Sequence, residues 1–179
     1  MTTHAQPVPS DQRYTPALRV LHWVIALLVL ATWPLGAVIG FVKEDVKLDF
    51  YLFHESIGFI VFWLLLLRVG VRLIHGRPAH DAPPIEKYAA FAVHGLLYLF
   101  LVVMPVSGFL ATNAHGFPLS WFGLFEVWSP IGKSPAIAGT FSAVHGWSAW
   151  ILISLVGLHV AAALFHHVVR RDGTLMRML

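Results

Sequence analysis

Four long apolar stretches dominate the pattern of hydrophobic and polar positions along this chain. They cover residues of about 17–42, 52–75, 86–112 and 142–169, with short polar segments between them. Each is longer than the ~20 residues that a helix needs to cross the hydrocarbon core of a bilayer. The pattern therefore predicts an all-α protein, an integral membrane, up-and-down four-helix bundle.

The remaining residues divide the chain into three parts. Residues 1–15 are polar and predict a disordered leader, residues 16–171 form the transmembrane domain, and residues 172–179 form a short tail. The leader lacks an apolar core followed by a small-residue cleavage site, so it does not have the pattern of a signal peptide. Because four crossings are even in number, we expect both termini on one side of the membrane.

Composition and charge agree with a membrane protein and indicate its orientation. Charged residues make up 12% of the chain, about half of the ~25% typical of soluble domains. The expected inner face carries nine basic residues: Arg13, Arg19, Arg68, Arg72, Arg77, Lys87, Arg170, Arg171 and Arg177. The other face carries only Lys43, Lys47 and Lys133. By the positive-inside rule, both termini are expected in the cytoplasm. The net charge of +3 therefore reflects membrane topology. The sequence has no basic patch interleaved with aromatic residues, so the pattern does not indicate a nucleic acid partner.

Histidine is the residue type that carries candidate chemistry. The chain has no cysteine but eleven histidines, several of them inside apolar stretches. The lack of cysteine excludes disulfides, thiolate-held iron–sulfur clusters and covalent haem attachment through C-x-x-C-H. Ionisable residues within membrane spans are costly and usually mark a functional site.

The spacing of histidines in the fourth stretch predicts two cofactor levels. His145 and His159 are fourteen residues apart, which is roughly 21 Å of helical rise and just under four turns. They therefore face nearly the same side, one in the outer half of the bilayer and one in the inner half. His54 matches the outer depth and His22 the inner depth. Two stacked cofactors in a bundle core need this arrangement.

Paired histidines at two depths favour haem over other metal groups. Imidazole ligands on both faces of a haem iron suit electron transfer rather than oxygen binding. A zinc site instead converges three or four ligands at one point. Gly58, one turn after His54, could let a macrocycle approach the backbone. Arg19, Arg68 or Arg72 could reach haem propionates, or could serve only as topology signals. Structural or proton-relay roles for the histidines remain the alternative.

Other polar residues in the spans leave several roles open. His94 could be an inner haem ligand, a quinone contact or a structural hydrogen-bonding residue. His166 lies two turns after His159 and could replace it as the inner ligand. The candidates for a quinone site are His94, Asn113, His159 and His166.

Several motifs resemble the bacterial cytochrome b-561 family over nearly the whole chain. They are RVLHW around His22, FHESIG with His54, VHGLLYLFLVVMPVSG in the third stretch, VHGW around His145, and GLHVAAALFHHVVRRDGTLMRML at the C-terminus. The resemblance extends to the cytochrome b subunits of formate dehydrogenase and nickel–iron hydrogenase. It implies two non-covalent haems b, with iron held by His54 and His145 at the outer level and by His22 and His159 at the inner level.

The resemblance also implies an oxidoreductase of the bacterial inner membrane that passes electrons to ubiquinone. Superoxide at the outer face is the leading donor, and a redox partner protein there is another. The outer loops give superoxide mixed support. A site that attracts this anion should be basic, but the three lysines of these loops are outnumbered by four acidic residues: Glu44, Asp45, Asp49 and Glu126. One alternative is a membrane anchor subunit that exchanges electrons between a partner dehydrogenase or hydrogenase and quinone. Another is a haem-free structural or transport bundle.

Overall fold

The structure, a computed structural model, describes residues 13–76, 78 and 83–179. Four helices account for most of it: α1 (Pro16–Val38), α2 (Glu44–His75), α3 (Pro84–His115) and α4 (Pro135–Phe165). Helix α4 continues into a π-helical turn, η2 (His166–Arg170), and the tail contains a short 3-10 helix, η3 (Leu175–Arg177). All four long helices are apolar and long enough to cross a membrane. The predicted all-α membrane four-helix bundle is therefore confirmed.

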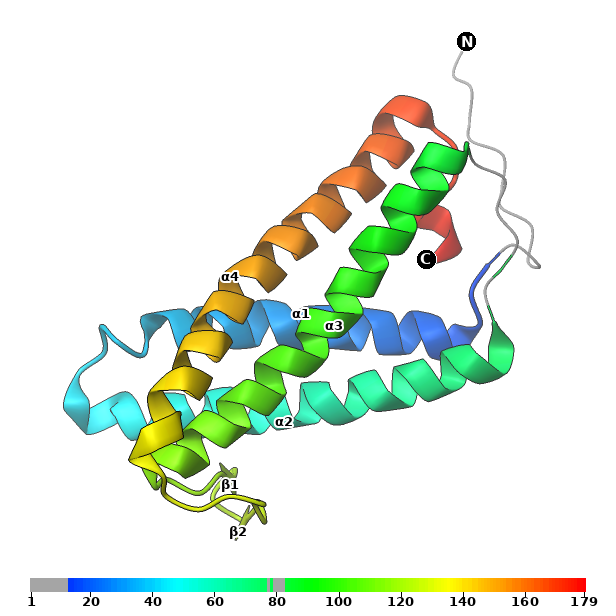
Figure 1. The fold of residues 1–179 in the computed structure, drawn as a ribbon. Helices are drawn as coiled ribbons and strands as arrows, with labels where there is room; N and C mark the ends of the chain where they lie inside the picture. The colour runs from blue at the N-terminus through cyan, green and yellow to red at the C-terminus, as the bar shows by residue number, and fades with distance from the viewer. Residues whose placement is uncertain (1–12, 77, 79–82) are drawn as a thin grey trace.

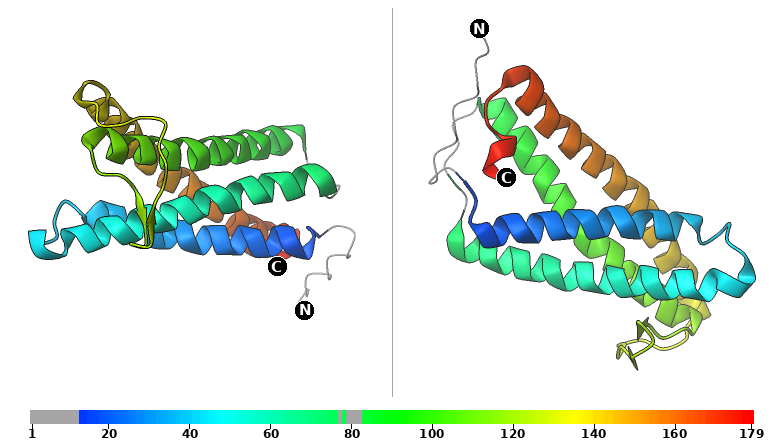
Figure 2. Two further views of the ribbon diagram at one scale, coloured as in Figure 1. Left: turned by 90° about the horizontal axis from the view of Figure 1, so that it is seen from below. Right: turned by 180° about the vertical axis from the view of Figure 1, so that it is seen from behind.

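The helices pack as two hairpins, with α1 mainly against α2 and α3 mainly against α4. The hairpins cross obliquely and diverge toward the end where α1 begins and α4 finishes (Figures 1 and 2). The buried apolar core lies in the middle of the spans and is formed by Ile25, Val29, Val61 and Leu152. Leu152 is halfway along α4 between His145 and His159, so this core separates the two histidine levels.

Two helices extend well beyond the apolar stretches that predicted them. Helix α2 begins at Glu44 and α4 at Pro135, because a helix can continue into the polar interface after its apolar run has ended. Glu44 and Asp45 in the first turn of α2 complement the positive end of the helix dipole. Pro135 occupies the first turn of α4, where its missing N–H costs nothing. Helix α1 ends earlier than its stretch, at Val38, and the chain then turns.

The loop between α3 and α4 is fixed to the N-terminal part of α2. It contains a two-stranded antiparallel hairpin, β1 (Ser120–Trp121) and β2 (Phe125–Glu126), which lies beyond the ends of the helices (Figure 1). The backbone N–H of Phe122 donates to Ser56 Oγ at 2.8 Å. The Phe122 ring packs edge-on against Phe53, with centroids 6.2 Å apart.

At the opposite end, the C-terminal tail folds back onto α1. Trp23 Nε1 donates to the Met178 carbonyl at 2.9 Å, and the N–H of Tyr14 donates to the Arg177 carbonyl at 3.1 Å. Partial burial alone would raise the pKa of Asp172, but hydrogen bonds from Thr174 and His166 lower this pKa to about 2. Asp172 is therefore a carboxylate at neutral pH and links the tail to the end of α4.

The start of α1 and the end of α4 lie at the same end of the bundle, as an even number of crossings requires. Residues 1–12 of the expected leader and Arg77 of the basic second loop lie outside the described residues. The division into leader, transmembrane domain and tail stays a prediction.

Candidate cofactor sites

At one of the two predicted levels, called outer after the orientation expected from the sequence, His54 of α2 faces His145 of α4. Their ring centroids are 5.9 Å apart and the ring planes are nearly perpendicular, at 88°. His54 Nδ1 donates to the Thr32 carbonyl on α1 at 3.0 Å, and His145 Nδ1 donates to the Met104 carbonyl on α3 at 2.8 Å. Because a carbonyl only accepts, Nδ1 of each ring carries the proton, and Nε2 has the lone pair that binds a metal.

At the inner level, histidines from three helices gather. His22 of α1 and His159 of α4 have ring centroids 6.1 Å apart. His94 of α3 lies 5.2 Å from His159 by the same measure, and its Nδ1 donates to the Ala90 carbonyl of its own helix at 2.6 Å. Helix packing therefore brings together the same partners that the depth argument paired, with His94 beside them.

Ring separation tests whether a haem iron fits between each pair. Imidazole nitrogen binds a first-row metal at about 2 Å, which puts two axial ring centres about 6 Å apart. The pairs His54–His145 and His22–His159 match this separation, at 5.9 and 6.1 Å. At 5.2 Å, the pair His94–His159 is too close. The fit favours His22 over His94 as the inner partner of His159, while ligation itself stays a prediction.

One buried arginine lies close to the inner level, and two further arginines at the start of the described chain have buried Nε atoms. Arg68 of α2 is only 7% exposed, donates to the Leu18 carbonyl of α1, and lies near enough to act electrostatically on both His22 and His159. Among the described residues, Nε of Arg13 and Nε of Arg19 are buried without a hydrogen-bond partner. Buried donors of this kind normally have an acceptor, and guanidinium groups bind carboxylates particularly well. The unpartnered Nε of Arg19, three residues before His22 in the sequence, therefore fits an acceptor such as the propionate of an inner haem.

The other predicted candidates occupy different surroundings. His166 lies in the π-helical turn, and its Nδ1 is hydrogen-bonded to Asp172 at 2.5 Å, which links the ring to the C-terminal tail. Asn113 is buried near the outer end of α3 and donates to the Phe109 carbonyl at 2.7 Å. A Cβ added at Gly58 would meet no atom within 4 Å, so the space beside it is open. Arg72 lies 5.7 Å from the centroid of the Tyr98 ring.

Three residues near the outer pair were not predicted from the sequence: Glu55, Gly36 and Gly108. Glu55 follows His54 in α2 and accepts a hydrogen bond from Thr112 Oγ1 at 2.8 Å. The position of Glu55 could have identified it as a candidate, because a carboxyl group inside an apolar stretch usually marks a functional site. Gly36 and Gly108 lie directly against the rings of His54 and His145. No sequence signal identifies them, since each ring comes from a different helix.

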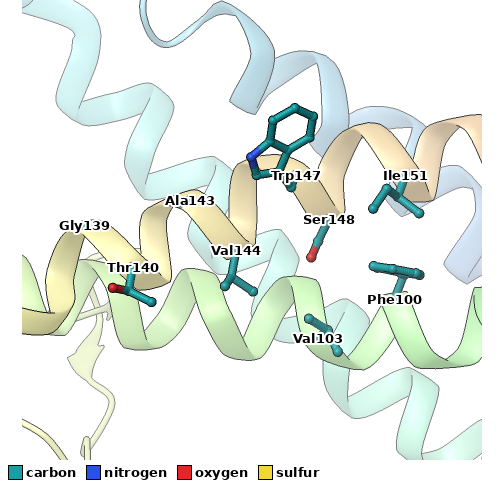
Figure 3. A pocket seen from close by; sticks show the side chains of 9 residues that line it. All are labelled: Phe100, Val103, Gly139, Thr140, Ala143, Val144, Trp147, Ser148 and Ile151. Carbon is teal, nitrogen blue, oxygen red and sulfur yellow. The ribbon is translucent and has the colours of Figure 1, made fainter.

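A shallow groove of about 650 Å³ runs between α3 and α4 (Figure 3). Its lining is mainly apolar, with the hydroxyl groups of Thr140 and Ser148 among side chains such as Val103 and Trp147. Trp147 is 72% exposed, as expected of a side chain that faces lipid. None of the predicted site residues lines this groove, so it does not form part of the histidine sites.

In the described part of the chain, no three His, Cys, Asp or Glu side chains are arranged to hold a single metal ion.

Comparison with known proteins identifies the family. Cytochrome b561 homolog 2 of Escherichia coli (strain K12) is 34% identical over 95% of this chain and 93% of that protein. Cytochrome b562 of Cereibacter sphaeroides is 32% identical over 93% of this chain and 94% of that protein. The probable superoxide oxidase CybB of Yersinia pestis is 28% identical over 89% of this chain and 91% of that protein. The sequence model of the prokaryotic cytochrome b561 family matches residues 13–179, and the chain therefore belongs to that family.

Proposed function

We propose that this membrane electron-transfer protein holds two haems b at different depths and links a one-electron donor at its outer face to ubiquinone. The observation that carries the proposal is the presence of two opposed histidine pairs, with ring centroids 5.9 and 6.1 Å apart. When bound, the haems would supply one-electron carriers at two levels of the membrane. Two imidazole ligands for each haem would suit electron transfer rather than oxygen binding.

At each level, the chain's own residues fix the ligands. His54 and His145 would hold the outer haem, oriented by the carbonyls of Thr32 and Met104. His22 and His159 would hold the inner haem, with Arg68 as a nearby positive charge. Arg19 has a buried donor suited to a propionate.

The distribution of basic residues supports the orientation. Residues beside the inner level are rich in arginine, whereas the opposite loops carry few basic residues. We therefore place both termini on the cytoplasmic side of the bacterial inner membrane. The pair His54–His145 then lies toward the outer face.

Superoxide is the leading donor. Support comes from the name of one relative, the probable superoxide oxidase CybB of Yersinia pestis. In the balanced reaction, two superoxide ions each lose one electron and become dioxygen. One ubiquinone takes up those two electrons and two protons to become ubiquinol.

The candidate quinone contacts fall at two ends of the molecule. Asn113 is close to the outer end of α3, whereas His94, His159 and His166 belong to the inner half. Loss of quinone reduction in an Asn113→Ala variant that retains both haems would favour an outer quinone site. The same loss in His94→Ala would favour an inner site.

Haem content tests the proposal most directly. Purified in detergent, the chain should contain two haems per polypeptide with low-spin b-type absorption bands in the oxidised and reduced states. One haem per chain would mean that one pair is wrongly assigned. No haem, from cells supplied with it, would contradict the electron-transfer function and return the histidines to structural or proton-relay roles.

The donor needs a separate measurement. Superoxide generated by xanthine oxidase should reduce the haem bands of the wild-type protein and, when ubiquinone is added, produce ubiquinol. His54→Ala should reduce this rate strongly, because it removes the outer haem. If dithionite reduces the haems but superoxide does not, the donor is another molecule, such as a partner dehydrogenase.

A further inference from the structure

We infer that Gly36 and Gly108 are positioning residues for the outer haem: each keeps a helix surface bare so that a ligand imidazole can reach a backbone carbonyl. This inference rests on the proposed role of His54 and His145 as haem ligands. The role of the two glycines follows from contacts on two separate helices, α1 and α3, that lie against the two rings of one pair.

The space at both glycines is filled by an imidazole ring. A Cβ added at Gly36 would lie 2.5 Å from Cε1 and 2.9 Å from Nδ1 of His54. A Cβ added at Gly108 would lie 2.7 Å from Nδ1 and 2.8 Å from Cε1 of His145. All four separations are below 3.0 Å, a limit that Cβ atoms in proteins essentially never cross. Any side chain at either position would therefore displace the ring.

The register of each glycine explains why it is there. Gly36 is four residues after Thr32, and Gly108 is four residues after Met104. Side chains in an α-helix lean toward its N-terminus, so the side chain of residue i+4 covers the carbonyl region of residue i. In both cases, that carbonyl accepts the hydrogen bond from a histidine Nδ1. Because glycine has no side chain, the carbonyl oxygen stays accessible, and the imidazole ring that donates to it occupies the space where a side chain would lie.

Other glycines in the long helices do not share this arrangement. A Cβ added at Gly58, Gly70, Gly95, Gly146 or Gly157 would have no neighbouring atom within 4 Å. Among the helical glycines of the described residues, close ring contact thus occurs only at Gly36 and Gly108. Gly70 offers a matched control, since it lies inside α2 and in open space.

Alanine at Gly36 or Gly108 should move the imidazole away from its carbonyl. The ring would lose the hydrogen bond that fixes its proton on Nδ1 and aims Nε2 at the iron, and such outer-shell bonds contribute strongly to metal affinity. Helix propensity works in the opposite direction, because alanine favours helix over glycine. A selective loss therefore cannot come from a weakened helix.

The test compares Gly36→Ala, Gly108→Ala, the double variant and Gly70→Ala, each purified in detergent. We expect haem content to fall to about half of the wild-type value in both single variants, with the low-spin electron paramagnetic resonance signal of the inner haem unchanged. The double variant should lose no more haem than either single variant, because both glycines serve the same haem. Gly70→Ala should match the wild type in haem content and spectrum.

The outcomes separate the two hypotheses. A wild-type chain without a haem between His54 and His145 would refute the proposed function itself. If the wild type holds both haems, and Gly36→Ala and Gly108→Ala keep both with unchanged resonance signals, the inference about the glycines is wrong. Loss of both haems in the single variants, but not in Gly70→Ala, would also overturn it, because the ring contacts concern only the outer pair.

Discussion

Alanine in place of His54 or His145 is expected to remove the outer haem and leave the inner haem bound. Each change deletes one of the two proposed haem ligands, whose rings are 5.9 Å apart, and one remaining imidazole would hold a non-covalent haem poorly. The proposed inner pair, His22 and His159, consists of different residues and lies beyond the apolar core around Leu152. The haem-to-protein ratio should therefore fall by about half, with similar spectra for the two variants.

The inner level provides the complementary test. His22→Ala and His159→Ala should each remove the inner haem, and their spectra should match each other. His94→Ala should keep two haems, because its ring is only 5.2 Å from His159 and leaves too little room for an iron. A His22→Ala variant with both haems, together with a His94→Ala variant that lacks one, would reverse the assignment of the inner ligand.

Removal of the charge at Arg68 should lower the midpoint potential of the inner haem. This buried guanidinium lies near both His22 and His159, and a positive charge favours the ferrous state over the more positive ferric state. At about 10 Å and an effective dielectric constant of about 20, one unit charge contributes about 2 kcal/mol. Since 59 mV is a tenfold change for one electron, we expect Arg68→Gln to lower the inner potential by roughly 50–100 mV.

A redox titration of each haem, followed by its absorption band, measures this effect. Arg68→Lys keeps the charge and should lower the potential much less. Arg72→Gln is the control on the same helix, because the Arg72 guanidinium lies over the Tyr98 ring. An unchanged inner potential in Arg68→Gln, or an equal decrease at both haems, would contradict the role of Arg68 at the inner level.

The number of spans and the depths of the histidines along them could be predicted from the sequence alone. Both are properties of a single helix, since a helix rises by about 1.5 Å per residue whatever packs against it. The fourteen-residue spacing of His145 and His159 therefore defines two levels before any tertiary contact is known. Helix ends were predicted less well, as the early start of α2 at Glu44 shows, because hydropathy records the hydrocarbon core rather than the helix.

The contacts between side chains of different helices became visible only in the packed fold. His22 and His94 lie at similar depths, and only their ring separations from His159 distinguish them. The π-helical turn directs His166 toward Asp172, although regular α-helical spacing put it on the face of His159. Gly36 and Gly108 are recognised as site residues only because histidine rings from neighbouring helices lie against them. The physical reason is that packing angle and register between helices depend on how whole surfaces fit, and no spacing within one helix encodes that fit.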